Sequence, residues 1–136
     1  MKSLIQTANT SVQAVSPTET SYAIVLLGNV VRRYGDNLRL NGTAVEETGA
    51  GYYEITGTVT VAPTTAGTVA IAVLENGEIM PGTLCSSSVS TATNPVTIPF
   101  VATSRVGCCC GTSSISVAVT AGAGNVTNVS LRVVKS

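Results

Sequence analysis

Apolar and polar residues alternate along several short segments of the chain, and this alternation predicts β-strands. The clearest segment is residues 51–62, GYYEITGTVTVA, in which Tyr53 and Ile55 fall on one face and Tyr52 and Glu54 fall on the other. A repeat of two residues is that of a strand with one buried and one exposed face. We therefore expect a half-buried strand over these residues.

Residues 68–75, TVAIAVLE, differ from this pattern because both of their faces are apolar. Such a strand is typically covered on both sides. Asn76 and Gly77 follow directly, and this pair is the strongest short signal for a β-hairpin, because both residues tolerate the positive φ of a type I′ turn. Asn41-Gly42 predicts a second tight turn.

Residues 95–103, PVTIPFVAT, alternate again, but they include Pro99, which has no N–H to donate to a neighbouring strand. The proline predicts a strand edge or a bulge at this point. No segment predicts a helix. The whole pattern favours one all-β domain, a sandwich or barrel of about ten short strands. The other strands are expected at residues 4–15, 22–27, 30–34, 38–40, 84–93, 114–120 and 129–133.

The composition supports an all-β fold. Valine and threonine each occur 20 times and leucine only 8 times, and β-branched residues pack well on pleated sheets. Charged residues make up 10% of the chain, against about 25% in an average domain. A surface so poor in charge is either solvated and rich in hydroxyls or buried against other copies of the chain.

The charges also exclude some partners. Seven positive and seven negative residues balance, so no overall field would attract nucleic acid or an anionic membrane. The apolar run Ala23–Leu27 is far shorter than the roughly 18 residues of a membrane span. Met1-Lys2 is not followed by the apolar segment of a signal peptide. We expect a chain made in the cytoplasm that binds neither nucleic acid nor membrane.

The sequence contains no histidine. This removes the commonest general base and metal ligand, together with the Ser-His and Cys-His nucleophile pairs. The acidic residues are scattered along the chain. Glu75 and Glu78 flank the Asn76-Gly77 turn, where a solvated hairpin end is favoured over an acid/base pair. We expect a protein that is not an enzyme, with no catalytic residues, no metal and no cofactor.

Four cysteines form the most unusual feature of the chain: Cys85 and the adjacent Cys108, Cys109 and Cys110. Neighbouring residues cannot easily direct both sulfurs at one ion, which disfavours zinc, although a threefold axis could gather more thiolates. A disulfide from Cys85 to one of the other three and bonds between chains also stay open. The interpretation that we favour is structural, with reduced thiols that pack as small apolar side chains.

Residues 51–82, GYYEITGTVTVAPTTAGTVAIAVLENGEIMPG, resemble the central strands of tumour-necrosis-factor-like jelly rolls. This superfamily includes the globular heads of complement and of collagen-tailed bacterial surface proteins. The upstream VVRRYGDNLRLNG and the downstream VTNVSLRVV are similar to segments of small bacteriophage and prophage proteins with this type of domain. The resemblance covers residues 28–135.

The resemblance implies a two-sheet jelly roll over residues 21–136 that assembles as a homotrimer. In this superfamily the "GYY" strand and the last strands commonly line the threefold axis. Residues 1–20 stand where relatives have a stalk or an anchor, and we expect them to form an arm that attaches the trimer to a larger particle. The residues that relatives use for receptors or calcium have no matching positions here. The candidates for the trimer interface are Tyr52, Tyr53, Ile55, Leu131 and Val133.

The function predicted from these observations is structural. We expect a bacteriophage virion protein, a trimeric capsid decoration, head fibre or fibre tip, which acts by assembly with other virion proteins after synthesis in the host cytoplasm. The alternatives are a module that recognises a host glycan or receptor through loops near Asp36-Asn37 or Ser86–Ser88, and a bacterial surface or spore-coat protein.

Overall fold

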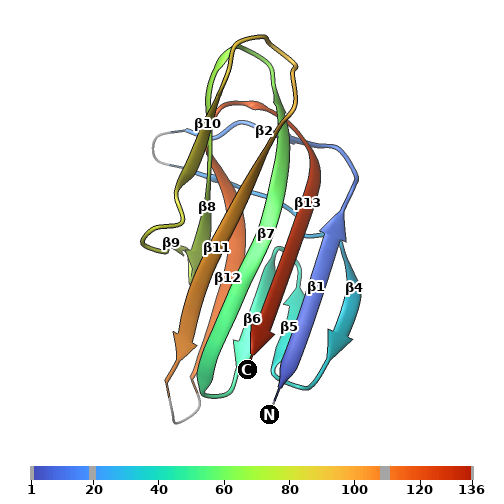
Figure 1. Ribbon diagram of the computed structural model, residues 1–136, viewed down its shortest axis with the longest axis vertical. Helices are drawn as coiled ribbons and strands as arrows, with labels where there is room; N and C mark the ends of the chain where they lie inside the picture. Colours follow the sequence, from blue (N-terminus) through green and yellow to red (C-terminus); the bar gives the residue numbers. More distant parts are fainter. Residues whose placement is uncertain (1, 19–20, 108–110, 136) are drawn as a thin grey trace.

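The computed structural model describes residues 2–18, 21–107 and 111–135 of the chain. These residues form two antiparallel β-sheets that pack face to face, and they contain no helix (Figure 1). The all-β sandwich expected from the alternating pattern is therefore confirmed. The described residues form thirteen strands rather than about ten, because residues 4–15 form two strands and two short strands, Ala44–Thr48 and Glu78–Ile79, lie outside the expected ranges.

The six-stranded sheet has the order β11-β7-β13-β1-β4, with β2 paired to β13. The strand at its centre is β13, the last strand of the chain. Its strands are β1 (Ser3–Asn9), β2 (Gln13–Val15), β4 (Asn29–Tyr34), β7 (Gly51–Pro63), β11 (Val96–Val106) and β13 (Gly124–Lys135).

The seven-stranded sheet has the order β10-β8-β12-β6-β5, with β3 paired to β12 and β9 paired to β8. Most of its strands are shorter than those of the six-stranded sheet. They are β3 (Ala23–Ile24), β5 (Leu38–Asn41), β6 (Ala44–Thr48), β8 (Gly67–Glu75), β9 (Glu78–Ile79), β10 (Cys85–Val89) and β12 (Thr112–Ala121).

The strand predicted at residues 51–62 is β7, and its alternation is as expected. Tyr53 and Ile55 are buried, whereas Tyr52 and Glu54 are exposed. The predicted hairpin after β8 is also present, since β8 and β9 pair directly across Asn76 and Gly77. Both turn residues have positive φ, 52° and 87°, as a type I′ turn requires.

Strand β8 is buried on both faces, as its apolar sequence predicted. Ile71 and Val73 belong to the core between the sheets. On the other face, Ala72 and Leu74 are 0% and 2% exposed. Ala72 lies opposite Ala118 on β12 in the same sheet, and Ala118 is also 0% exposed.

Pro99 lies on β11, which is the border strand of the six-stranded sheet. It is exposed and sits opposite Thr58 of β7, with its ring on the side away from the core. A border strand has one side without a neighbouring strand, so the missing N–H of Pro99 costs no ladder hydrogen bond there. The edge placement predicted from this proline is confirmed.

The first strand pairs with the last. β1 runs antiparallel to β13, with Ser3 opposite Lys135, and β4 covers the other side of β1. Ile5 is fully buried. Residues 3–9 and 13–15, which we expected to lie in an arm outside the domain, are strands of the sandwich instead, because their apolar side chains have places in the core.

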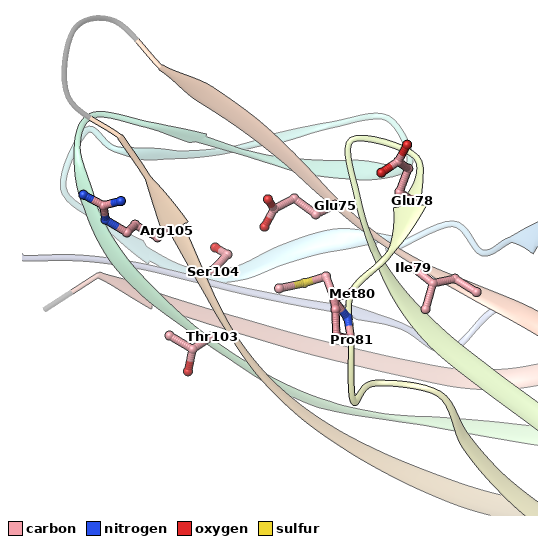
Figure 2. A pocket seen from close by; sticks show the side chains of 8 residues that line it. All are labelled: Glu75, Glu78, Ile79, Met80, Pro81, Thr103, Ser104 and Arg105. Carbon is pink, nitrogen blue, oxygen red and sulfur yellow. The ribbon is translucent and has the colours of Figure 1, made fainter.

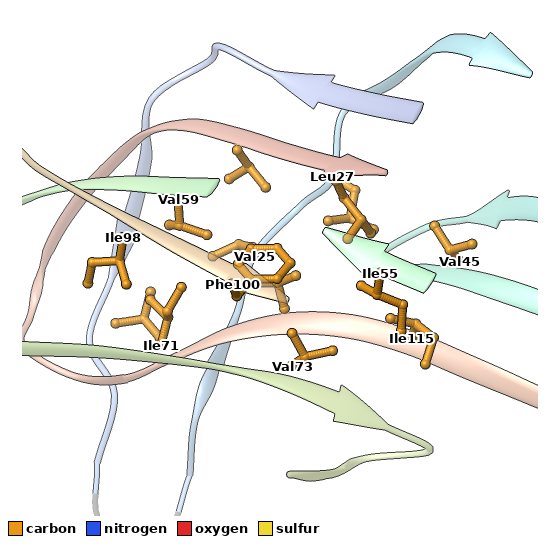
Figure 3. Packing of buried hydrophobic residues seen from close by; sticks show 14 of the residues in the cluster. Val25, Leu27, Val45, Ile55, Val59, Ile71, Val73, Ile98, Phe100 and Ile115 are labelled. Carbon is orange, nitrogen blue, oxygen red and sulfur yellow. The ribbon is translucent and has the colours of Figure 1, made fainter. Parts of the chain in front are cut away.

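The core fills the space between the two sheets. Figure 3 shows Ile98 and Phe100 of β11 beside Ile71 and Val73 of β8. Phe100 lies opposite Gly57 of β7. A Cβ on Gly57 would stand 2.7 Å from the ring carbon Cζ of Phe100 and would also contact the carbonyl oxygen of Ser130. The aromatic ring therefore occupies the space that a side chain at position 57 would need.

Candidate functional site

The outward side of the six-stranded sheet forms a broad surface that the described residues leave uncovered, and we call it the open face. The pairing registers arrange its side chains in rows that cross the strands. Its residues are Leu4, Gln6 and Ala8 of β1, Arg32 and Tyr34 of β4, Tyr52, Glu54, Thr56, Thr58 and Thr60 of β7, Thr97, Pro99, Val101, Thr103 and Arg105 of β11, and Asn128, Ser130, Arg132 and Val134 of β13.

Small hydroxyl side chains dominate the centre of the open face. Thr60 and Thr97 lie opposite each other on β7 and β11, and their hydroxyl oxygens are 2.9 Å apart. A hydroxyl pair that satisfies itself can be covered by another protein surface at a low desolvation cost. Val101 and Tyr52 are 72% and 60% exposed on the same face. The face is thus nearly free of acidic groups and partly apolar.

The charges on the open face are mainly positive. Arg32, Gln6 and Arg132 stand in one row, since Gln6 of β1 lies opposite both arginines. At one end of the face, the guanidinium of Arg105 lies over the ring of Tyr52, 5.9 Å from its centroid. This distance is within the range of a cation–π contact. Glu54 is the one acidic residue of this surface.

A second feature lies at the border of the sandwich, where β11 approaches the β8–β9 hairpin. Here a cavity of about 360 Å³ opens to solvent, and we call it the edge pocket (Figure 2). Two acidic residues, three apolar residues, two residues with hydroxyls and one arginine contribute to its wall. It is lined by Glu75, Glu78, Ile79, Met80, Pro81, Thr103, Ser104 and Arg105.

Behind the edge pocket lies a carboxyl group that is fully buried. Glu47 of β6 points between the sheets, and the hydroxyl of Ser104 lies 2.7 and 2.9 Å from its two carboxylate oxygens. Burial raises the pKa of Glu47 from 4.5 to about 7, the Ser104 hydrogen bond lowers it, and the negative charge of Glu75 raises it further. The group is therefore poised to change its charge near neutral pH.

Tyr53 belongs to the same polar region. It lies on β7 opposite Ser104 of β11, and its hydroxyl is fully enclosed. The hydroxyl is 2.9 Å from the carbonyl oxygen of Thr48 and 2.8 Å from that of Gly49. Burial, together with the charge of Glu47, raises the pKa of Tyr53. Tyr53 therefore anchors the turn between β6 and β7.

Of the five residues expected at a trimer interface, one faces outward and four are buried inside the chain. Tyr52 lies on the open face, where it can contact another copy. The other four side chains are 0% exposed and pack inside the single chain, so direct contact with a second copy would fall to their outward-facing neighbours instead. These four are Tyr53, Ile55, Leu131 and Val133.

Cys85 is the one cysteine among the described residues. It lies on β10, is half-buried and packs against the edge of the core opposite Ile71. That position agrees with a thiol that acts as a small apolar side chain. The predictions for Cys108, Cys109 and Cys110 lie outside the described residues.

Some side chains of the loops named as candidates for recognition form hydrogen bonds within the chain, and others are exposed. Asn37 donates from Nδ2 to the carbonyl oxygen of Thr48 at 2.6 Å and accepts from Ser3 Oγ at 2.9 Å. It therefore ties the β4–β5 turn to the sheet ends. Asp36 is exposed. Ser86, Ser87 and Ser88 belong to β10, where Ser87 faces inward and the other two are exposed.

The buried Glu47 and the edge pocket were not found from the sequence. Glu46-Glu47 stood out only as a like-charged pair, and no strand was expected over Ala44–Thr48. A two-residue alternation through Val45 and Glu47 was the available signal, since Val45 is buried as well.

Within residues 2–18, 21–107 and 111–135, no three cysteine, aspartate or glutamate side chains come together as metal ligands. No helix in that part of the chain is long and apolar enough to cross a membrane.

Neither a protein-family model nor a curated protein matches the sequence. Solved structures do match the fold. Murine APRIL at pH 5.0 has a TM-score of 0.76 at 17% sequence identity, and the match covers 100% of both chains. The Eiger TNF of S. frugiperda has a TM-score of 0.67 at 14% identity, over 100% of this chain and 92% of that one. The fold is a tumour-necrosis-factor-like jelly roll.

A vertex protein shares this jelly roll as well. The PRD1 vertex protein has a TM-score of 0.55 at 13% identity, and the match covers 98% of this chain and 95% of that one. Identities this low show the fold alone. The resemblance stated from residues 51–82 is therefore confirmed for the jelly roll itself.

Proposed function

We propose that this protein is a structural component of a bacteriophage particle that assembles as a homotrimer through its open face. The observation that carries the proposal is the open face itself, five strands wide and lined by hydroxyl and apolar side chains. Obligate interfaces of this kind bury about 2,000 Å² or more, and they are poor in charge at their centre.

Two further observations support a role in a particle. The PRD1 vertex protein is a viral structure with the same jelly roll. The chain is also poor in charge, 10% of its residues, and this fits a protein whose surface is largely covered by neighbours. Attachment to other virion proteins would use exposed residues near the start of the chain, such as Val12, which is 66% exposed.

The oligomeric state tests the assembly. We expect the purified protein to sediment as a single species with three times the mass of the chain. Val101→Glu, on the border strand β11 of the open face, should give a monomer, because a buried carboxylate at an interface is costly to desolvate. Val12→Glu is the matched control, since Val12 is similarly exposed but lies outside the open face, and it should stay trimeric. A monomeric natural protein would contradict the proposal.

Mass spectrometry of purified particles tests the location. The protein should be among the abundant components of phage particles grown on the host, in a copy number divisible by three. Recovery only from the cell surface or from spores would instead support one of the alternative roles. Specific binding to a glycan array by the trimer would favour recognition over a purely structural role.

A further inference from the structure

The open face carries three arginines and one acidic residue, whereas the edge pocket carries two carboxylates beside Arg105. On the open face, Arg32 and Arg132 share a row with the neutral Gln6. At the border of the sandwich, Glu75 and Glu78 of the β8–β9 hairpin, which belongs to the seven-stranded sheet, face the edge pocket. Two open faces brought together would set arginines against arginines. Copies of this chain are thus electrostatically suited to meet edge to face, in a head-to-tail contact.

The lining of the edge pocket matches an arginine side chain. Figure 2 shows Glu75 and Glu78 on the two strands of the hairpin, with Met80 below them. A guanidinium binds carboxylates with paired hydrogen bonds. The aliphatic stem of an arginine packs on apolar side chains, here Ile79 and Met80. A cavity of about 360 Å³ has room for such a group.

Arg105, the arginine that lines the pocket, does not place its guanidinium between Glu75 and Glu78. Arg105 lines the pocket, but its guanidinium is held over Tyr52 on the open face, 5.9 Å from the ring centroid. In Figure 2 its charged end points away from Glu75 and Glu78. The carboxylates of Glu75 and Glu78 therefore face the mouth of the pocket. Arg105, the one cation among the residues that line the pocket, does not reach them.

Arg132 is the arginine best placed to reach a neighbouring copy. It stands on β13, the central strand of the six-stranded sheet, and it is exposed between the neutral neighbours Gln6 and Thr56. Arg32, by comparison, lies on the border strand β4 and donates from Nη1 to the carbonyl oxygen of Val31 at 3.0 Å. A contact centred on Arg132 would bury more of the open face than a contact centred on Arg32.

We propose that the edge pocket binds the Arg132 side chain of a second copy of this chain, between Glu75 and Glu78. This inference rests on the proposed trimer and names the surface that the open face meets. Each copy then offers its open face to one neighbour and its edge pocket to the other. A head-to-tail contact of this kind closes into a ring when the rotation between copies is a third of a turn.

Charge reversal tests the contact. Arg132→Glu and Glu78→Arg should each weaken trimer formation by about tenfold or more, measured by sedimentation over a range of protein concentrations. The double variant Arg132→Glu/Glu78→Arg should associate more tightly than either single variant, because the pair is restored with its charges exchanged. Arg39→Glu is the control, since Arg39 lies on β5 of the other sheet and should leave the trimer unchanged.

The outcomes separate this contact from the assembly itself. A natural protein that is monomeric overturns both proposals. A trimer that survives both single reversals, or a double variant no better than the singles, overturns the contact and leaves the trimer standing. If Arg132→Glu does not fold, as judged by circular dichroism, Arg132→Gln and Glu78→Gln replace the reversals, and both must weaken association for the contact to stand.

Discussion

The hydroxyl of Ser104 lies 2.7 and 2.9 Å from the two carboxylate oxygens of Glu47, so one side-chain contact joins the two sheets across 57 residues of sequence. Ser104 belongs to β11 and Glu47 to β6, and both are buried. A buried carboxyl with a single hydroxyl partner is less well stabilised when charged than it is in water. The stability of the fold should therefore depend on the charge of Glu47.

The first prediction concerns pH. Because the pKa of Glu47 is raised from 4.5 to about 7, the folded state keeps this proton between these values while the unfolded state releases it. The free energy of unfolding should therefore fall as the pH rises from 4.5 to 7, by up to about 3 kcal/mol from this group. Urea titrations at half-unit intervals of pH measure it.

Two variants isolate the contribution of Glu47 to this pH dependence. Glu47→Gln should remove the decline, because an amide does not titrate, whereas Glu46→Gln, one residue away on the opposite face, should leave it in place. An unchanged decline in Glu47→Gln would assign the effect to another group.

The second prediction removes the hydroxyl. Ser104→Ala should destabilise the fold by about 2 kcal/mol at pH 8, where Glu47 is charged, and by about 1 kcal/mol or less at pH 5. The difference arises because a hydrogen bond to a carboxylate is stronger than one to a neutral carboxyl group. Chemical denaturation at the two pH values measures both losses. Ser88→Ala, on the exposed side of β10, should have no such dependence.

The third prediction concerns the glycine beneath Phe100. Gly57→Ala should lower the free energy of unfolding by about 3 kcal/mol, because the added methyl group would collide with the Phe100 ring and with the Ser130 carbonyl oxygen. Thermal unfolding followed by circular dichroism measures the loss. Gly107→Ala is the control, since no atom of residues 2–18, 21–107 and 111–135 lies within 4 Å of its added Cβ. A melting temperature lowered equally by both changes would argue against the collision.

The fourth prediction is a stabilising change. Thr7 of β1 faces the core, and its hydroxyl oxygen Oγ1 has no hydrogen-bond partner among the described residues. Thr7→Val keeps the shape and removes this unsatisfied group, so the free energy of unfolding should rise by about 1 kcal/mol. Thr60→Val removes a hydroxyl that is satisfied by Thr97 and should give no gain. A loss of stability in Thr7→Val would show that the hydroxyl has a partner.

The sequence predicted much of the fold, because local chemistry fixes those features. The alternation through Tyr53 and Ile55 gave the inward face of β7, the Asn76-Gly77 pair gave the hairpin, and Pro99 gave the border strand. Each of these signals depends only on residues close together in the chain. Such signals report the conformation of a strand or turn and say little about the strand that it meets.

The features that escaped prediction depend on residues far apart in the chain. Glu47 is buried because the side chain that satisfies it, Ser104, comes 57 residues later. The edge pocket needs β11 to approach a hairpin from the other sheet. In β13, the register shifts between Val126 and Asn128, so Val126 and Val129 both face inward. Simple alternation cannot foresee such a bulge.

The pairing of β1 with β13 bears on how the molecule reaches its native state. The central pair of the six-stranded sheet joins the two ends of the chain, so this sheet cannot close until β13 is available. Contacts so distant in sequence carry a large loop-closure entropy, and proteins dominated by them fold in milliseconds to seconds. On the ribosome, β1 could pair with β4 early but would lack β13 until residues 124–135 have been synthesised, and protection from aggregation would matter most during that interval.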